Sequence, residues 1–175
     1  MKKLSLLLTM LVAFTCTAVH AQFTQAQLVG EFTRAKAYTK AYLDAMPEDG
    51  YSLKPTPVMR TFAQQMLHLA DGGYFLVGIA TGKPNPLGKD VSAEKTIAQT
   101  KEATTKAVMD SYDYVIATLQ GMTPAQLQET VNFAKKTISK FELFGKAFEH
   151  QTHHRGQTTV YLRLKGVTPP DEMLF

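Results

Sequence analysis

Apolar side chains recur every three or four residues in four long segments of the chain, which is the spacing of one face of an α-helix. The first segment opens with Thr24 three residues before Gln27, a capping-box pattern, and Phe23 is placed to pack on Leu28. The second opens at Thr56-Pro57, an N-cap followed by proline in the first turn. The four predicted helices run from Thr24 to Met46, Thr56 to Leu76, Ala93 to Leu119 and Ser139 to Gly166.

The segment between the last two predicted helices has a different pattern. Thr123-Pro124-Ala125-Gln126 is typical of a capped short helical turn. Apolar Val131 and Phe133 then alternate with polar neighbours, which indicates a brief strand or hairpin within residues 129–137. Four helices of about 20 to 27 residues with modest connections predict an all-α fold, a four-helix bundle with one longer excursion before its last helix.

The N-terminus has the features of a secretory signal peptide. Lys2 and Lys3 precede a mostly apolar run, and Val19-His20-Ala21 is a small-x-Ala cleavage site before Gln22. The apolar run is shorter than the roughly 20 residues of a membrane-spanning helix. We therefore predict a signal peptide over residues 1–21, export to the periplasm or the medium, no membrane anchor after cleavage, and one domain over residues 22–175.

Charge and cysteine content exclude some classes of function. The chain has 19 basic and 15 acidic residues, and removal of Lys2 and Lys3 leaves 17 (19 − 2) against 15. This balance is not that of a nucleic-acid-binding protein, so no nucleic-acid partner is expected. The only cysteine, Cys16, lies in the signal, so the mature domain has no disulfide, thiol nucleophile or thiolate ligand.

Three of the five histidines lie close together in the last predicted helix. His150 and His154 are one turn apart on the same face, a spacing that lets two imidazoles reach one metal ion. His153 points about 60° to the other side of His150. Two histidines at this spacing can also be ordinary surface or core residues, and Gln151 stands where a His-Glu-x-x-His motif needs glutamate.

His68 lies in the middle of the second predicted helix, off its most apolar line. Its neighbours one turn away are mostly polar, for example Gln65 and Asp71. Such a stripe is either the solvent-exposed face of the helix or the polar lining of a cavity. The residues alone leave both interpretations open.

Three motifs together give the chain a resemblance to the DinB-like (DinB/YfiT) family of metalloenzymes. They are Met66-Leu67-His68-Leu69-Ala70-Asp71, His150-Gln151-Thr152-His153-His154-Arg155-Gly156-Gln157, and the closing segment from Tyr161 to Pro170. The resemblance covers essentially the whole mature chain and implies a four-helix bundle. It also implies that His68, His150 and His154 are three metal ligands and that His153 is not one. Some members of this family resemble thiol-dependent transferases or isomerases and others hydrolases, and export makes a thiol co-substrate less expected here.

Three neutral imidazoles leave a coordination position for water or substrate, as catalytic sites do. Nitrogen ligands suit zinc, nickel, iron or manganese, so a divalent ion of this group is the expected cofactor. Asp71 and Gln157, each about one turn from a histidine, are candidates to orient the ligands from the second shell, although both could be ordinary surface residues. Arg155 would bind an anionic group or, as we favour, pair with a surface acid.

Two functions fit this pattern. The first is an exported metal-dependent hydrolase that acts on a small molecule through metal-bound water. The second is a non-catalytic bundle in which the metal links two helices, and the lack of an evident general base beside the histidines favours it. No catalytic residue, substrate or metal identity follows from the sequence, which also allows a homodimer.

Overall fold

The computed structural model describes residues 24–175. The predicted signal peptide over residues 1–21, its cleavage before Gln22 and the predicted contact of Phe23 lie outside this part of the chain. Within residues 24–175, no helix combines the length and the apolar character that a membrane crossing requires.

The first described helix, α2 (Gln25–Ala45), starts as the sequence predicts. The hydroxyl of Thr24 accepts a hydrogen bond from the backbone N–H of Gln27, and the Gln27 side chain accepts one from the Thr24 N–H. This capping box satisfies two N–H groups that the first turn leaves free. Pro47 follows the helix, and a single 3₁₀ turn, η1 (Glu48–Gly50), leads the chain out of it.

Helix α3 (Phe62–Thr81) begins later than predicted. Its N-cap is Thr61, whose hydroxyl accepts from the Gln64 N–H at 3.0 Å while the Gln64 side chain accepts from the Thr61 N–H at 2.9 Å. The prediction of a start at Thr56 is therefore wrong. The preceding segment folds back instead, because the backbone carbonyl of the buried Tyr51 accepts a hydrogen bond from the second residue of α3.

The predicted single third helix is two helices. A short α4 (Ala93–Thr96) is followed by a turn and then by α5 (Lys101–Gln120). Ile97 has an extended backbone and packs into a small apolar cluster beside the bundle. Thr100 then caps a new helix by accepting from the third N–H of α5. The chain turns here because burial of Ile97 and the cap at Thr100 are incompatible with one continuous helix.

The predicted short helical turn and hairpin are both present, as α6 (Pro124–Gln128) and the antiparallel strands β1 (Thr130–Phe133) and β2 (Lys136–Ser139). Ser139 ends β2 and caps α7 (Lys140–Leu164), the longest helix described. The hairpin therefore sets the point at which the last helix begins.

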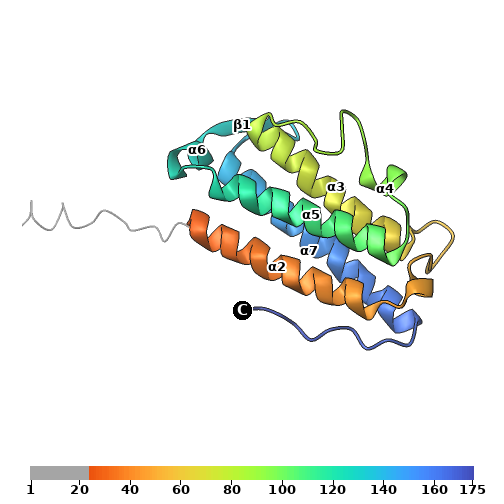
Figure 1. Cartoon of the computed structure of the whole chain (residues 1–175). Helices are drawn as coiled ribbons and strands as arrows, with labels where there is room; N and C mark the ends of the chain where they lie inside the picture. The colour runs from red at the N-terminus through yellow and green to blue at the C-terminus, as the bar shows by residue number, and fades with distance from the viewer. Residues whose placement is uncertain (1–23) are drawn as a thin grey trace, which may run out of the picture.

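The four long helices form a bundle in the order α2, α5, α3, α7 around one core (Figure 1). Both α2 and α3 contact α5 and α7, so α2 lies diagonally opposite α3, and α5 lies diagonally opposite α7. Figure 1 shows α3 and α5 running in the same direction, joined by the connection 82–100 that returns along the bundle. The all-α, four-helix-bundle prediction is confirmed, and α3 and α7, the two histidine-bearing helices, are neighbours.

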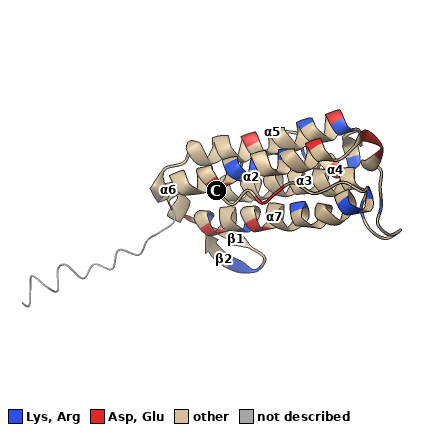
Figure 2. Ribbon diagram, turned by 90° about the horizontal axis from the view of Figure 1, so that it is seen from below, with Lys and Arg blue, Asp and Glu red and all other residues tan. Residues whose placement is uncertain are grey.

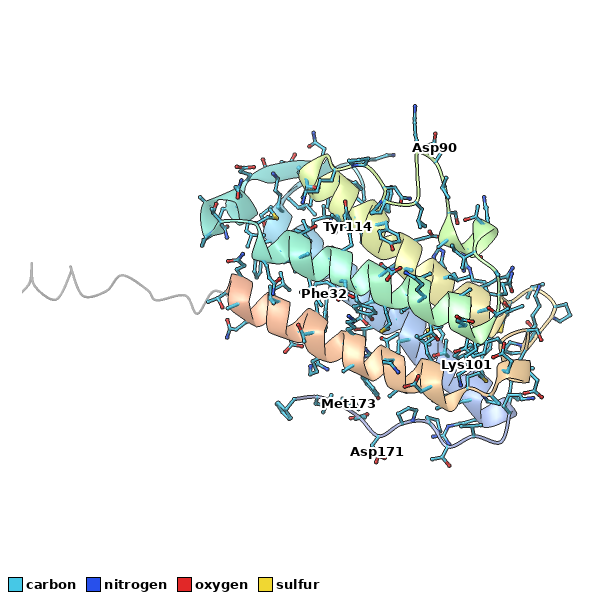
Figure 3. The ribbon with its side chains drawn as sticks, viewed as in Figure 1. Phe32, Asp90, Lys101, Tyr114, Asp171 and Met173 are labelled. Atoms are coloured by element: carbon cyan, nitrogen blue, oxygen red, sulfur yellow. The ribbon has the colours of Figure 1, made fainter. Side chains whose placement is uncertain are left out.

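Aromatic and aliphatic side chains fill the core. Phe32, labelled in Figure 3, is 2% exposed and packs edge-on against Phe148 of α7. Charged side chains lie outside, and Figure 2 shows basic and acidic residues interspersed along the helices. Exposed ion pairs contribute about 0–1 kcal/mol each, so burial of the core accounts for most of the stability. The C-terminal segment, with Asp171 and Met173 labelled in Figure 3, runs beside α2, where Arg34 donates to the Met173 carbonyl.

Candidate metal centre

His68 of α3 and His150 and His154 of α7 come together where the two helices pack. Their ring centroids are 4.4 Å apart for His150 and His154, 4.6 Å for His68 and His154, and 5.5 Å for His68 and His150. Each offers one ring nitrogen, and these three atoms lie within 4.8 Å of one another. Ligand atoms around a tetrahedral zinc ion are about 3.4 Å apart, so small side-chain movements would bring the three nitrogens into a first shell.

Burial keeps two of these histidines in the form that binds metals. His154 is only 8% exposed, and burial, followed by the charges of His150 and His68, lowers the pKa of His154 to about 3. Burial, followed by the charge of His68, also lowers the pKa of His150. Both imidazoles are therefore neutral near pH 7, and only a neutral imidazole has the lone pair that a metal ion needs.

Glu94, which the sequence analysis did not single out, contacts His68. The Nδ1 atom of His68 donates to Oε2 of Glu94 at 3.0 Å, and Nε of Arg60 donates to the other carboxylate oxygen at 2.8 Å. A carboxylate at Nδ1 fixes the tautomer in which Nε2 is free to bind a metal ion. No local pattern marks this residue, because it lies on α4, beyond a loop that only the tertiary fold brings back to α3.

Asp71 was predicted to orient a histidine ligand directly, but its hydrogen bonds go to the start of α4. Its carboxylate accepts hydrogen bonds from the Ser92 hydroxyl at 2.7 Å, the Ala93 N–H at 2.6 Å and the Glu94 N–H at 3.1 Å. Asp71 therefore anchors the start of α4 and thereby positions the glutamate that contacts His68. Oxygens of Asp71 and Glu94 also lie within 4.8 Å of a His68 nitrogen, but these carboxylates are already engaged. We therefore consider the three-histidine set the better metal site.

Gln157, the other predicted orienting residue, reaches the site through Gln65. The Gln65 amide lies 3.0 Å from Nδ1 of His154 and is also hydrogen-bonded to the Gln157 side chain. The Gln157 amide in turn lies 2.8 Å from Nε2 of the exposed His153. Because Nδ1 of His154 is occupied by this contact, its Nε2 is the nitrogen left for a ligand. Gln65 is 2% exposed. The only feature of the sequence that pointed to this residue was its position one turn from His68 on a polar stripe.

Arg155 does not form the predicted surface ion pair. It is 8% exposed, its guanidinium lies 4.2 Å from the centre of the Tyr38 ring, and Nη1 donates to Oε1 of Gln151 at 3.2 Å. No carboxylate within residues 24–175 forms a salt bridge with it. The aromatic face stabilises the cation in place of an acid, so the expectation was wrong, because the residue faces the core.

Two clefts flank the histidine cluster. A cleft of about 720 Å³ has His68 and His150 on its wall and extends between α3 and residues 83–95. A second, of about 470 Å³, lies toward Arg60 and Gln65. Glu94 lines both. His68 and His150 are thus accessible to a small molecule from the larger cleft, whereas the buried His154 lines neither cleft.

The sequence matches the family model of the DinB superfamily over residues 31–158, well over half of the chain. The chain belongs to the DinB superfamily. The matched range contains all three histidines of the cluster and Glu94. The predicted family membership is therefore confirmed.

Comparison with a curated protein gives a shorter match. The uncharacterized protein YrdA of Bacillus subtilis (strain 168) is 37% identical over 68 residues. These residues are 36% of this chain and 41% of YrdA, so the match spans less than half of that relative's length.

Solved structures show the same bundle. A DinB-like protein from Bacillus cereus ATCC 10987 has a TM-score of 0.74 at 18% identity, covering 84% of this chain and 96% of that one. The DinB-like protein YjoA from Bacillus subtilis has a TM-score of 0.66 at 22% identity, with 85% and 96% covered. YfiT from Bacillus subtilis, described as a probable metal-dependent hydrolase with an unusual four-helix bundle topology, has a TM-score of 0.61 at 16% identity, with 83% and 89% covered. At these identities the likeness establishes the fold alone.

Proposed function

We propose that this protein is a metal-dependent hydrolase in which His68, His150 and His154 hold one divalent ion. The observation that carries the proposal is the opening of the cluster: His68 and His150 line a cleft of about 720 Å³. Structural zinc sites have four protein ligands, whereas three ligands beside a cleft leave a position for water or substrate. The description of YfiT as a probable metal-dependent hydrolase agrees with this reaction class.

The residues around the cluster fit such an ion. When bound, a divalent ion supplies Lewis acidity and lowers the pKa of its water, and zinc, nickel, iron or manganese would accept these nitrogen ligands. Glu94 orients His68, Gln65 orients His154, and the bare backbone of Gly72 makes room for the His150 ring. The larger cleft supplies the space in which a substrate would meet the open side of the cluster.

A structural ion that only links α3 to α7 is the alternative. It would explain the position of the histidines at the contact of these helices equally well. It does not require a cleft of small-molecule size on the open side, which is the reason that we favour catalysis. Hydrolysis by the metal-loaded protein that a chelator abolishes would support our proposal over this one.

The first experiment compares two adjacent histidines. The metal content of the dialysed native protein is measured beside that of His154→Ala and His153→Ala. His154 is buried in the cluster, whereas the exposed His153 contacts Gln157, so we expect metal loss in His154→Ala alone. Equal loss in both variants, or greater loss in His153→Ala, would show that the ligand assignment is wrong. A panel of ester, amide and phosphoester substrates with and without chelator then tests hydrolysis.

Export is a separate proposal and rests on residues 1–21 alone. The basic start, the apolar run and Val19-His20-Ala21 support cleavage before Gln22. Intact-mass measurement of the protein from fractionated cells tests it. Full-length protein that remains in the cytoplasm would contradict it.

A further inference from the structure

We propose that the larger cleft binds the apolar acyl chain of an ester or amide substrate, whose carbonyl group then lies at the three histidines. This inference rests on the proposed metal-dependent hydrolysis and adds the chemical class of the substrate. It follows from three features of the cleft: the face of α3 that forms its floor, residues 83–95 that form its roof, and the position of its charged side chains.

The floor of the cleft is one face of α3 that leads away from His68. Gly72, Phe75 and Ile79 follow His68 at intervals of four, three and four residues, so they lie in one line along the helix. At 1.5 Å per residue, this line is about 16 Å long. It starts at the histidine cluster and continues over carbon-rich side chains, which suits an extended chain held by its end at the metal site.

Phe75 is the most unusual residue of this floor. It is 62% exposed, more than any other large hydrophobic side chain in the helices of residues 24–175. Single exposed hydrophobic residues are common on convex surfaces, but Phe75 lines a cleft beside a candidate metal centre. An apolar wall beside polar groups is typical of small-molecule sites, and about 720 Å³ lies within their usual size range.

The roof of the cleft, residues 83–95, is held at several points. The Asn85 side chain donates to the Val91 carbonyl at 2.9 Å and accepts from the Leu87 N–H at 2.9 Å, which closes the loop on itself. The hydroxyl of Tyr114, labelled on α5 in Figure 3, donates to the Pro84 carbonyl at 3.3 Å. With α4 anchored by Asp71, both ends of the roof are fixed, so the cleft is preformed.

The charges of the cleft lie on residues 83–95 and at Asp71, and not on the α3 line of Gly72, Phe75 and Ile79. The carboxylates of Asp71 and Glu94 are hydrogen-bonded to the protein. Lys83, Lys95 and Asp90 are exposed, and within residues 24–175 none of them forms a salt bridge. Figure 3 shows Asp90 on the loop that rises away from the bundle. The α3 side of the cleft, with Gly72, Phe75 and Ile79, carries no charge, so an uncharged acyl chain matches this side.

Hydroxamic acids with linear chains of two to ten carbons test the proposal, because the hydroxamate chelates a metal ion while the chain probes the cleft. Their dissociation constants are measured by calorimetry on the zinc-loaded protein. We expect acetohydroxamate to bind and each further methylene to tighten binding by up to about fourfold until the cleft is filled. Phe75→Ala should weaken binding of the longer chains on the order of fivefold, with unchanged zinc content and unchanged acetohydroxamate binding.

Leu164→Ala is the matched control. Leu164 is 58% exposed on α7 and lines neither cleft beside the cluster, so its truncation should leave the whole series unchanged. Binding of acetohydroxamate without any gain from chain length would overturn the acyl-chain proposal and leave the metal site intact. Equal weakening by both alanine variants would also overturn it. Failure to retain zinc would instead refute the proposed function, and this inference with it.

Discussion

Gly72→Ala should abolish strong metal binding although it adds only one methyl group. A Cβ atom at position 72 would overlap Cε1 and Nδ1 of the His150 ring and lie 3.0 Å from its Nε2. Carbon and nitrogen atoms that are not bonded cannot approach so closely, so the ring must swing away. The larger cleft beside it gives the ring space to do so without unfolding α7. One of the three proposed ligands would then be lost.

The same change should not destabilise the fold of the metal-free protein. Alanine within a helix is about 0.5–1 kcal/mol more favourable than glycine. For a domain of this size, about 1 kcal/mol corresponds to a shift of about 2–4 °C in Tm. We therefore expect a metal-free Tm that is equal or slightly higher, together with a metal affinity that is at least 10-fold to 100-fold weaker, since changes that only misorient a ligand already cost about this much.

Competition with a chromophoric chelator measures the affinity, and thermal unfolding of the chelator-treated protein measures the fold. Gly156→Ala is the matched control, because Gly156 lies between His154 and Gln157 on α7 and an added Cβ atom there has no neighbour within 4 Å. It should keep the affinity and gain the same helix stability. Full affinity in Gly72→Ala would refute the assignment of His150 as a ligand, and a large fall of Tm in the metal-free protein would refute the assumption that the ring is free to move.

Three further predictions follow from the geometry. Glu94→Gln should weaken metal binding about 10-fold to 100-fold, measured by chelator competition, because it removes the charge that orients the bound imidazole; Glu149→Gln, at an exposed pair with a lysine, should change nothing. The metal-free protein should lose stability to urea as the pH falls below 6.5, because the unfolded chain then gains a proton that the folded His154, with a pKa of about 3, does not take up; a flat profile between pH 7 and pH 5 would contradict this. Thr61→Ala should cost about 1 kcal/mol of unfolding free energy and Thr56→Ala less than about 0.5 kcal/mol, since α3 is capped by the first and not by the second.

Local signals in the sequence predict most of the helix boundaries. The capping patterns that begin at Thr24 and Thr123 each involve residues only three apart, and both form as predicted. Thr61 and Gln64 make the same pattern, which is a stronger start signal than the threonine and proline at Thr56. The start of α3 was placed wrongly because Thr56-Pro57 was preferred to Thr61 and Gln64. The helix begins at the second pair because its capping box makes two reciprocal hydrogen bonds.

Local sequence spacing predicts one part of the candidate site, and the other part depends on tertiary structure. The spacing of His150 and His154 places both on one face of α7, and any straight helix would do this. The contact of Glu94 with His68 depends on the return of residues 82–92 over α3 and on the break at Ile97, which no short pattern predicts. The orienting carboxylate was therefore missed, and the bundle with its paired histidines was predicted.

The histidine ligands and the roof of the cleft lie in parts of the fold that tolerate substitution differently. His68 and His154 lie on long helices that pack against each other in the core, so their positions are fixed by the stability of the whole bundle. Glu94 and the roof of the cleft belong to the connection 82–100, which is held to α3 mainly by the three hydrogen bonds of Asp71 and by a small apolar cluster. Substitutions in that connection change few core contacts, so the shape of the cleft can change while the histidine cluster is retained. The cleft therefore combines a floor on α3, where Phe75 lies, with a roof on the less constrained connection, and changes in the roof would alter the proposed acyl-chain site without moving the histidines.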